Sequence, residues 1–230
     1  MQAVLDNLDA VLRAFAYTGL LFVIASIGSL VLGTLLVAMR VGPVAVLRKA
    51  AAVWVTGVRN TPLLVILIFF RFAGPKVGIT FSFVDVRISE GIRLTDVFTA
   101  CVVGLTVYTS VFVCEALRSG INAVPLGQAE AARAIGLTFG GTMRRVVLPQ
   151  AFRASLPPLT SVQIAMLKNT TVCGAVGVVE AFARMRILNN DYTTQVVQIF
   201  LVFALVFIVA VELLSLLANR LEKRAAVVRR

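Results

Sequence analysis

Five long hydrophobic runs alternate with short polar intervals along the chain. They cover residues 14–39, 51–73, 95–118, 156–179 and 195–218. Each is longer than the roughly 20 residues that a helix needs to cross the hydrocarbon core of a bilayer. The pattern predicts an all-α polytopic membrane protein with five transmembrane helices. Residues 1–13 have amphipathic helical spacing and are predicted to lie at the membrane interface, and residues 219–230 form a basic tail.

The second hydrophobic run is interrupted by polar residues. The segment Arg59-Asn60-Thr61-Pro62 lies inside it, and Pro62 has no backbone N–H to donate. A polar, kinked break is costly in lipid, so we expect it to face protein or a cavity. Residues 74–94 show no strong helical period and are predicted to be a loop.

Composition supports the membrane class. Hydrophobic residues make up 59% of the 230 residues and charged residues only 14%, whereas soluble domains have about a quarter charged residues. All three cysteines fall in apolar segments, which indicates reduced thiols, and the absence of histidine excludes a Cys/His zinc site. The first residues lack a basic region, so the first run is predicted to be a retained helix rather than a cleaved signal.

Basic residues gather on one side of the predicted membrane. Thirteen of the 22 lie in residues 40–49, 118–154 and the tail from 220, and seven lie on the opposite side with most of the acids. By the positive-inside rule the first side is cytoplasmic, which places the N-terminus outside and the C-terminus inside. The net charge of +11 therefore does not indicate nucleic-acid binding.

The cytoplasmic loop 119–154 is the longest polar-marked interval. Within it, residues 130–135 favour a helix that ends at Gly136. Two interpretations stay open: a re-entrant hairpin that only covers the bundle, or a short helix that inserts into a partner's groove. Such a helix could transmit motion only if both of its ends were rigidly tied to the spans.

No catalytic constellation is visible. The chain has no phosphate loop of the GxxxxGK[ST] type, no nucleophile elbow and no evident carboxylate pair, so it is predicted not to be an enzyme. If it drives active transport, energy comes from a partner or an ion gradient.

Polar residues inside the spans have competing interpretations. Lys168 lies within the fourth span, where a lone lysine costs roughly 2.5–3.5 kcal/mol. It is either a substrate or gate contact, or an interhelical anchor that snorkels. Arg59 has the same two interpretations. Glu115 is expected to pair with Arg118 on its own helix, and Glu180 to be interfacial.

Residue spacing within the cytoplasmic loop resembles the EAA loop of ABC importer permeases. Glu130-Ala131-Ala132 is followed after three residues by Gly136, after nine more by Val146, and then by Leu148-Pro149. The usual pattern has isoleucine in place of Val146, which is a conservative departure. A long motif with fixed gaps is strongly specific.

Other segments, from about residue 14 to 218, resemble the polar amino acid permeases, and most of all the glutamate permeases of actinobacteria. Many relatives have Lys-Asp-Thr-Ser where this chain has Lys168-Asn169-Thr170-Thr171. The matching segments are Met39-Arg40-Val41, Val58-Arg59-Asn60-Thr61-Pro62-Leu63, Tyr108, residues 115–121, Gly127-Gln128, Leu148-Pro149-Gln150-Ala151, Leu156-Pro157-Pro158-Leu159, Lys168-Asn169-Thr170-Thr171 and Gly177-Val178-Val179-Glu180.

The resemblance implies a type I ABC importer permease in the plasma membrane of a bacterium. In such importers two permease subunits, identical or different, form the pathway, an ATPase dimer binds ATP and Mg, and an extracytoplasmic binding protein delivers the amino acid. No cofactor is expected in this chain. The EAA segment is the coupling helix, so the residues expected to dock with the ATPase are Glu130, Ala131, Ala132, Arg133 and Gly136.

A glutamate substrate is anionic, and cationic and hydroxyl groups within the spans would suit its carboxylates. Because the same lysine occurs in permeases for cationic amino acids, Lys168 cannot set selectivity by charge alone, and selectivity is expected to reside largely in the binding protein. The candidate pathway residues are Lys168, Asn169, Thr170, Thr171, Arg59, Asn60 and Thr61.

Three alternatives remain at this point. The chain could belong to a glutamine, arginine or cystine importer of the same class. It could be an ion-driven secondary carrier that works without an ATPase. It could also be a membrane assembly protein whose basic loop only recruits a soluble partner.

Overall fold

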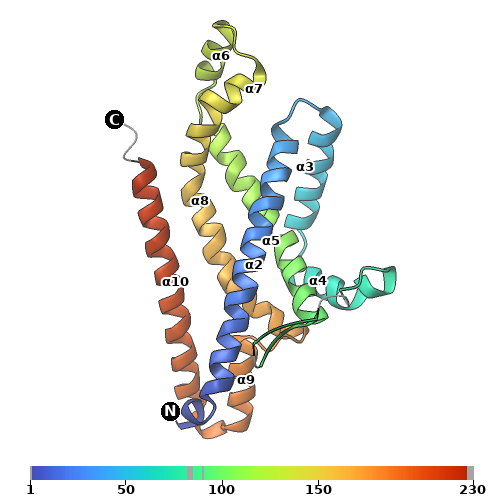
Figure 1. Ribbon diagram of the computed structural model, residues 1–230, viewed down its shortest axis with the longest axis vertical. Coiled ribbons are helices and arrows are strands. Elements are labelled where there is room, and N and C mark those ends of the chain that lie inside the picture. Colours follow the sequence, from blue (N-terminus) through green and yellow to red (C-terminus); the bar gives the residue numbers. More distant parts are fainter. Residues whose placement is uncertain (1, 82–84, 90, 227–230) are drawn as a thin grey trace.

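The computed structural model describes residues 2–81, 85–89 and 91–226. Its long helices run roughly along one axis: α2 (Leu8–Val41), α5 (Asp96–Asn122), α8 (Leu148–Asn169) and α10 (Val196–Ala226) (Figure 1). The shorter helical elements are α1 (Gln2–Asp6), α3 (Ala45–Arg59), α4 (Leu63–Ile68), η1 (Phe69–Ala73), η2 (Gly74–Val77), α6 (Leu126–Ala134), α7 (Phe139–Thr142), η3 (Met143–Val147), η4 (Thr170–Val176), α9 (Ala181–Asp191) and η5 (Thr193–Gln195).

Three helical stretches in the described chain are long and apolar enough to cross a membrane: 8–41, 96–122 and 193–224. There are up to five candidate spans if each of two bent pairs is one span, which fits the five predicted runs. The first span begins earlier than predicted, because residues 8–13 continue into α2 and only α1 stands apart.

The predicted break in the second run is present. Helix α3 ends at Arg59 and α4 begins at Leu63, and the two segments are bent by 103°. Pro62 stands between them with an extended backbone (φ −59°, ψ 140°), because its ring and missing N–H favour the end of one helix and the start of another.

The fourth span differs from its predicted bounds. Helix α8 begins at Leu148 rather than at 156, and it runs through Pro157 and Pro158, whose fixed φ is compatible with a helix. The chain then tightens into the 3₁₀ helix η4 and ends at Gly177, which has a φ of 108°. Helix α9 follows at a bend of 54°.

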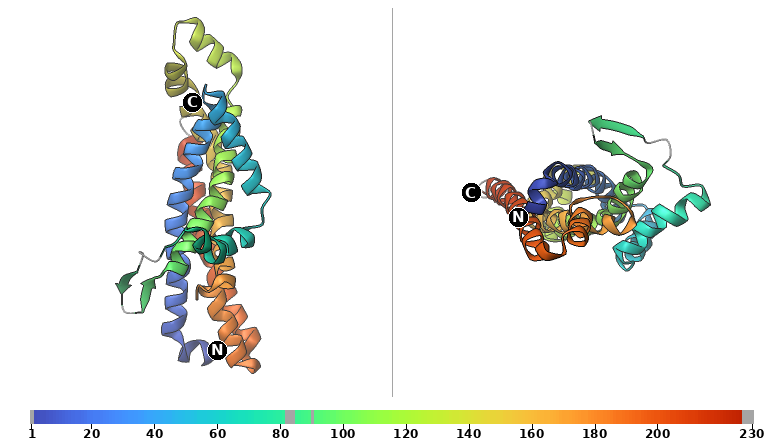
Figure 2. Two further views of the ribbon diagram at one scale, coloured as in Figure 1. Left: turned by 90° about the vertical axis from the view of Figure 1, so that its right-hand side faces the viewer. Right: turned by 90° about the horizontal axis from the view of Figure 1, so that it is seen from below.

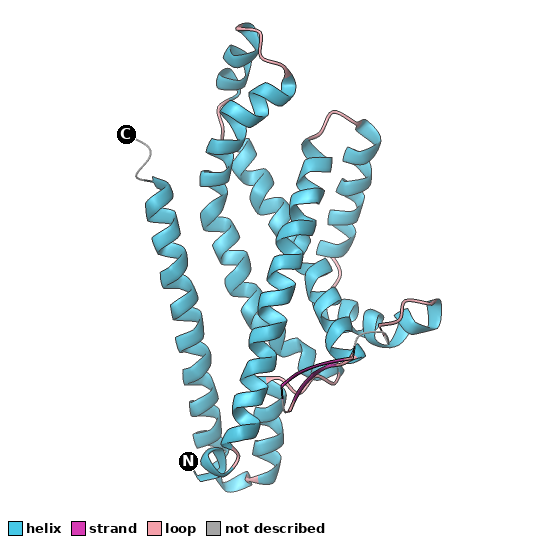
Figure 3. Cartoon of the chain, in the orientation of Figure 1, coloured by secondary structure: helices cyan, strands magenta, loops and turns pink. Residues whose placement is uncertain are grey.

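Two strands lie in the segment predicted to be a loop. Strands β1 (Val86–Ser89) and β2 (Ile92–Leu94) form an antiparallel hairpin in which Arg87 lies opposite Arg93 (Figure 3). The prediction of a loop over 74–94 was wrong for these residues, because two strands of three or four residues leave too short a pattern to detect.

Helix α5 packs between α2 and α8, and small residues allow close approach. A Cβ added to Gly33 of α2 would lie 2.5 Å from Cγ1 of Val113 and 2.7 Å from the carbonyl oxygen of Ser110. On the other side, a Cβ at Gly120 would overlap the Ala151 carbonyl oxygen of α8. The backbones of these three helices are therefore nearly in contact.

Buried apolar side chains form one central cluster and smaller satellites. The central cluster joins Leu21 of α2, Leu67 of α4, Leu105 of α5, Met166 of α8 and Cys173 of η4. Helix α10 is different, because only 11% of its most apolar window is buried inside the protein. Its exposed leucines and valines are suited to contact with lipid chains.

The three basic segments gather at one end of the molecule. Helices α6 and α7, the turn between α2 and α3, and the C-terminal part of α10 lie at this end, whereas the N-terminus and α9 lie at the other (Figures 1 and 2). The charge asymmetry found in the sequence therefore corresponds to a physical asymmetry between the two ends.

We expect Gly33→Ala to lower the melting temperature of the detergent-solubilised protein by roughly 5 °C, since overpacking at a tight contact typically costs about 1–3 kcal/mol. Gly19→Ala is the matched control. Gly19 lies on the same helix as Gly33, and a Cβ added there would meet no neighbouring atom within 4 Å. Equal melting temperatures for the two variants would show that the α2–α5 contact does not require glycine.

Candidate functional site

Helix α6 projects from the basic end as the tip of a helical hairpin (Figure 1). It ends in a Schellman motif: the Gly136 N–H donates to the Arg133 carbonyl (2.9 Å) and the Leu137 N–H to the Ala132 carbonyl (3.1 Å). Gly136 adopts a φ of 92°, a left-handed conformation that favours glycine. The predicted helix stop at Gly136 therefore has a specific backbone cause.

Both ends of this hairpin are tied to long helices. Val124, just after α5, packs with Val147 and with Ala151 of α8 in one buried cluster. The Gln150 side-chain N–H donates to the Gln128 amide oxygen at 2.6 Å, which joins α8 to α6. The hairpin is therefore joined by packing and by a side-chain hydrogen bond to the long helices on both sides of it.

The surface of α6 combines polar and unexpectedly apolar residues. Glu130, Ala131 and Arg133 are exposed, while Ala132 is buried against the hairpin. Large apolar side chains missed by the sequence analysis flank them: Leu126 is 79%, Ile135 82% and Phe139 52% exposed. Such side chains on a basic, polar projection favour contact with another protein. In the sequence, these large apolar residues stand in an otherwise polar loop, and that contrast could have identified them.

The residues predicted around Lys168 lie where α8 changes to η4. Lys168 is exposed near the end of α8, and Thr170 is buried. The Thr170 hydroxyl donates to the Leu167 carbonyl and the Thr171 hydroxyl to the Lys168 carbonyl, both at 2.7 Å. Both hydroxyls keep acceptor capacity, but only that of Thr171 belongs to a partly exposed residue, since Thr170 is fully buried.

Helix α4, which follows the break in the second span, packs against this region. Leu63 and Leu67 pack in the same cluster as Met166 and Cys173, so α4 lies against η4. The polar residues before α4 are more peripheral: Arg59 and Asn60 are exposed, and the Thr61 hydroxyl donates to the Gly57 carbonyl at 2.9 Å. Among the described residues, no hydrogen bond joins Arg59 to the Lys168 segment.

Two acidic residues have contacts beyond those expected. Glu115 forms the expected ion pair with Arg118 on its own helix, at 4.0 Å, and a closer one with Arg40 across the α2–α5 contact. Glu180 is fully buried rather than interfacial. Its carboxylate caps α9 by accepting the N–H groups of Phe182 and Ala183 at 2.8 Å each.

Some buried polar side chains in the described chain have no hydrogen-bond partner, and three lie on the central helices. They are the hydroxyls of Ser26 on α2 and Thr109 on α5, and the whole side-chain amide of Gln163 on α8. In the α5–α8 contact, Val113 packs with Leu159 and Leu105 with Met166. Thr109 lies between Leu105 and Val113 along α5, and Gln163 lies between Leu159 and Met166 along α8; no motif in the sequence pointed to either.

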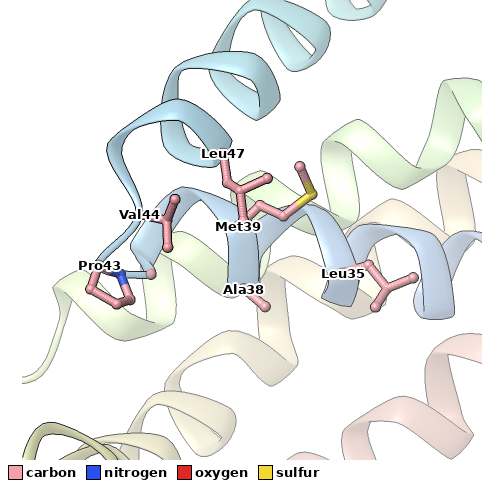
Figure 4. A pocket seen from close by; sticks show the side chains of 7 residues that line it. Leu35, Ala38, Met39, Pro43, Val44 and Leu47 are labelled. Carbon is pink, nitrogen blue, oxygen red and sulfur yellow. The ribbon is translucent and has the colours of Figure 1, made fainter.

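An apolar pocket of about 440 Å³ lies where α2 turns into α3 (Figure 4). It is lined by Leu35, Ala38, Met39, Gly42, Pro43, Val44 and Leu47. With no polar side chain, this pocket cannot recognise the charged groups of an amino acid. Within the described part of the chain, no cluster of three acidic or cysteine side chains could hold a metal ion.

Comparison with known proteins supports one family. The family described as "Binding-protein-dependent transport system inner membrane component" matches residues 18–227. The glutamate transport system permease protein GluC of Corynebacterium glutamicum is 39% identical over 219 residues, with 95% of each chain covered. The probable glutamine ABC transporter permease protein GlnM of Bacillus subtilis is 35% identical, with 95% of this chain and 94% of that protein covered.

Solved structures agree on the fold. A crystal structure of an amino acid ABC transporter with histidines has a TM-score of 0.82 at 26% identity and covers 97% of both chains. An inward-facing MetNI methionine ABC transporter has a TM-score of 0.72 at 20% identity, which supports the fold alone. The chain therefore belongs to the family of binding-protein-dependent inner membrane transport components, with the type I fold of ABC importer permeases.

Proposed function

We propose that this chain is a permease subunit that imports glutamate or a related polar amino acid, driven by a separate ATPase. The observation that carries the proposal is α6, a short helix with exposed Glu130 and flanking apolar side chains, tied at both ends to long helices. The glutamate permease relative, with 39% identity over 95% of its length, supports the substrate class.

The basic end of the molecule is proposed to face the cytoplasm. Thirteen of the 22 basic residues occupy segments at this end, which is the asymmetry that the positive-inside rule associates with the cytoplasmic side. Helix α6 then meets a cytoplasmic ATPase dimer, which binds ATP and Mg. The proposed docking segment comprises Glu130, Ala131, Ala132, Arg133 and Gly136. Glu130, Ala131 and Arg133 are exposed on α6, Ala132 packs against the hairpin and holds the helix in place, and Gly136 sets the turn.

Motion of α6 reaches the pathway through α8. The cluster of Val124, Val147 and Ala151 fixes α6 to the first turns of α8, and Lys168 lies at the far end of the same helix. When the ATPase draws α6 toward its counterpart in a second permease subunit, α8 shifts as a rigid element. The segment around Lys168 then alternates its exposure between the two sides.

The solute is proposed to pass the two broken spans. Lys168, Asn169 and the hydroxyls of Thr170 and Thr171 supply groups for carboxylates and an ammonium. The Arg59-Asn60-Thr61 break adds a cationic group where the second span changes direction. Irregular backbone at membrane depth is tolerated where it lines a cavity, which favours both breaks as parts of the path.

Uptake of labelled glutamate into proteoliposomes tests the class of transporter. The vesicles contain this chain, its ATPase and second permease, with binding protein outside, and we expect uptake only with ATP inside. Uptake that needs a sodium or proton gradient instead would establish a secondary carrier. No uptake under any condition would favour an assembly protein.

Glu130→Arg is expected to weaken association with the ATPase by about tenfold or more, because reversing a charge at a complementary interface costs several kcal/mol. Co-purification and a binding titration in detergent measure the effect. The matched control is Glu222→Arg, which reverses the same charge on α10 away from α6. Undiminished co-purification of the Glu130 variant would contradict the docking role.

Lys168→Met is expected to reduce ATP-driven uptake by roughly tenfold or more, since a hydrogen bond to a charged group contributes about 1.5–3 kcal/mol. Lys168→Arg retains the charge and serves as the control that should keep most activity. Initial rates over a range of loaded binding protein separate kcat from KM effects. If the methionine variant transports like the wild type, Lys168 has only a structural role.

A further inference from the structure

The β1–β2 hairpin extends sideways from the helix bundle, at the end of α5 that is opposite to α6 (Figures 1 and 2). The sequence analysis assigned it no role, and the proposed transport cycle does not use it. It is also the only sheet in the described part of the chain.

The hairpin is held against α2 at two points. The Tyr17 hydroxyl accepts the Arg93 N–H at 2.9 Å and donates to the Arg93 carbonyl at 3.1 Å, which satisfies the outer edge of β2. At the tip, Gly91 has a φ of 91°, and a Cβ there would lie 2.5 Å from the guanidinium of Arg13. The hairpin is therefore a preformed element, and partners lose less entropy on binding such an element.

One face of the hairpin is charged. Asp85, Arg87 and Arg93 line a shallow depression of about 360 Å³. Arg93 forms an ion pair with Asp85, and hydrogen bonding to this guanidinium holds the pKa of the Asp85 carboxyl below its usual value. Arg87 is exposed and has no ion-pair partner among the described residues. Among the described side chains that line the depression, Arg87 is therefore the positive charge without an ionic partner.

The hairpin also carries exposed apolar side chains. Val86 precedes Arg87 on β1 and points to the opposite side. Ile88 lies at the register shift between Arg87 and Ser89, and each of the two apolar side chains is about half exposed. An arginine together with exposed apolar residues on a fixed scaffold has the composition of a protein–protein contact. The partner that fits this charge presents carboxylates.

The hairpin continues directly into the central helix. Strand β2 ends at Leu94, and Thr95 caps α5 by accepting the Phe98 N–H. Helix α5 has 27 residues, or about 40 Å, and its far end leads into α6. A force on the hairpin is therefore applied to the helix whose far end leads into α6, where the proposed ATPase contact lies.

We infer that the β1–β2 hairpin is a docking element for the extracytoplasmic binding protein, with Arg87 receiving a carboxylate of that protein. The inference rests on the proposed function, which places this end outside the membrane. The family itself is described as binding-protein-dependent, so such a partner is required. Insertion into lipid is disfavoured, because the outer edge of β1 is not paired by another strand in the described chain and hydrocarbon cannot hydrate its peptide groups.

The test uses the complete importer in nanodiscs of zwitterionic lipid. ATPase activity is measured against the concentration of glutamate-loaded binding protein. We expect Arg87→Glu to raise the half-saturating concentration about tenfold and to leave the basal rate unchanged. Arg87→Lys should behave nearly like the wild type. Lys76→Glu is the matched control, because Lys76 is exposed at the same end but lies on η2, outside the hairpin.

Three results would overturn the inference. The first is a half-saturating concentration for Arg87→Glu equal to that of the wild type. The second is an equal rise for Lys76→Glu, which would indicate a general electrostatic effect of charge at this end of the molecule. The third is an effect of Arg87→Glu that appears only when anionic lipid is added, which would indicate a lipid surface. Failure of the proposed function is distinguishable, since the wild-type complex itself would then show no stimulation by any loaded binding protein.

Discussion

Backbone groups that enter the hydrocarbon core must find hydrogen bonds within the protein, and the layout of the chain follows from this constraint. Three long helices satisfy it within themselves. The two broken spans pack on each other: Leu63 and Leu67 of α4 share a core with Cys173 and Val176 of η4 and with residues of α2, α5 and α8. The break at η4 is therefore largely covered by protein, whereas Asn60 and Pro62 at the break in the second span are exposed on this subunit.

The close packing of α5 against α2 and α8 connects the two ends of the molecule. Gly33 and Gly120 bring the backbones of α2 and α8 nearly into contact with α5, and the Arg40–Glu115 ion pair joins α2 to α5 near the basic end. Packed interfaces of this kind move between discrete arrangements rather than deforming gradually. A permease that alternates between two exposures benefits from that property.

Features encoded by local patterns could be predicted from the sequence, and features that depend on distant contacts could not. The five runs, the break before Pro62 and the helix stop at Gly136 each have a local cause in hydropathy or backbone restriction. The fourth hydrophobic run starts at 156, yet α8 begins at Leu148 and continues through Pro157 and Pro158, packed against α5. The Arg40–Glu115 pair joins residues 75 positions apart, which no local pattern reveals.

The same distinction applies to the candidate site. The spacing of the loop pointed to Glu130 and its neighbours, but the apolar side chains Leu126, Ile135 and Phe139 gain significance only when α6 is seen to project. The position of α6 in the fold connects the proposals. Helix α6 lies between the end of α5 and the start of α8, so any displacement of it acts on both helices. The far end of α5 carries the β1–β2 hairpin and the far end of α8 carries Lys168. The proposed binding-protein contact, the proposed solute path and the proposed ATPase contact therefore share one pair of helices.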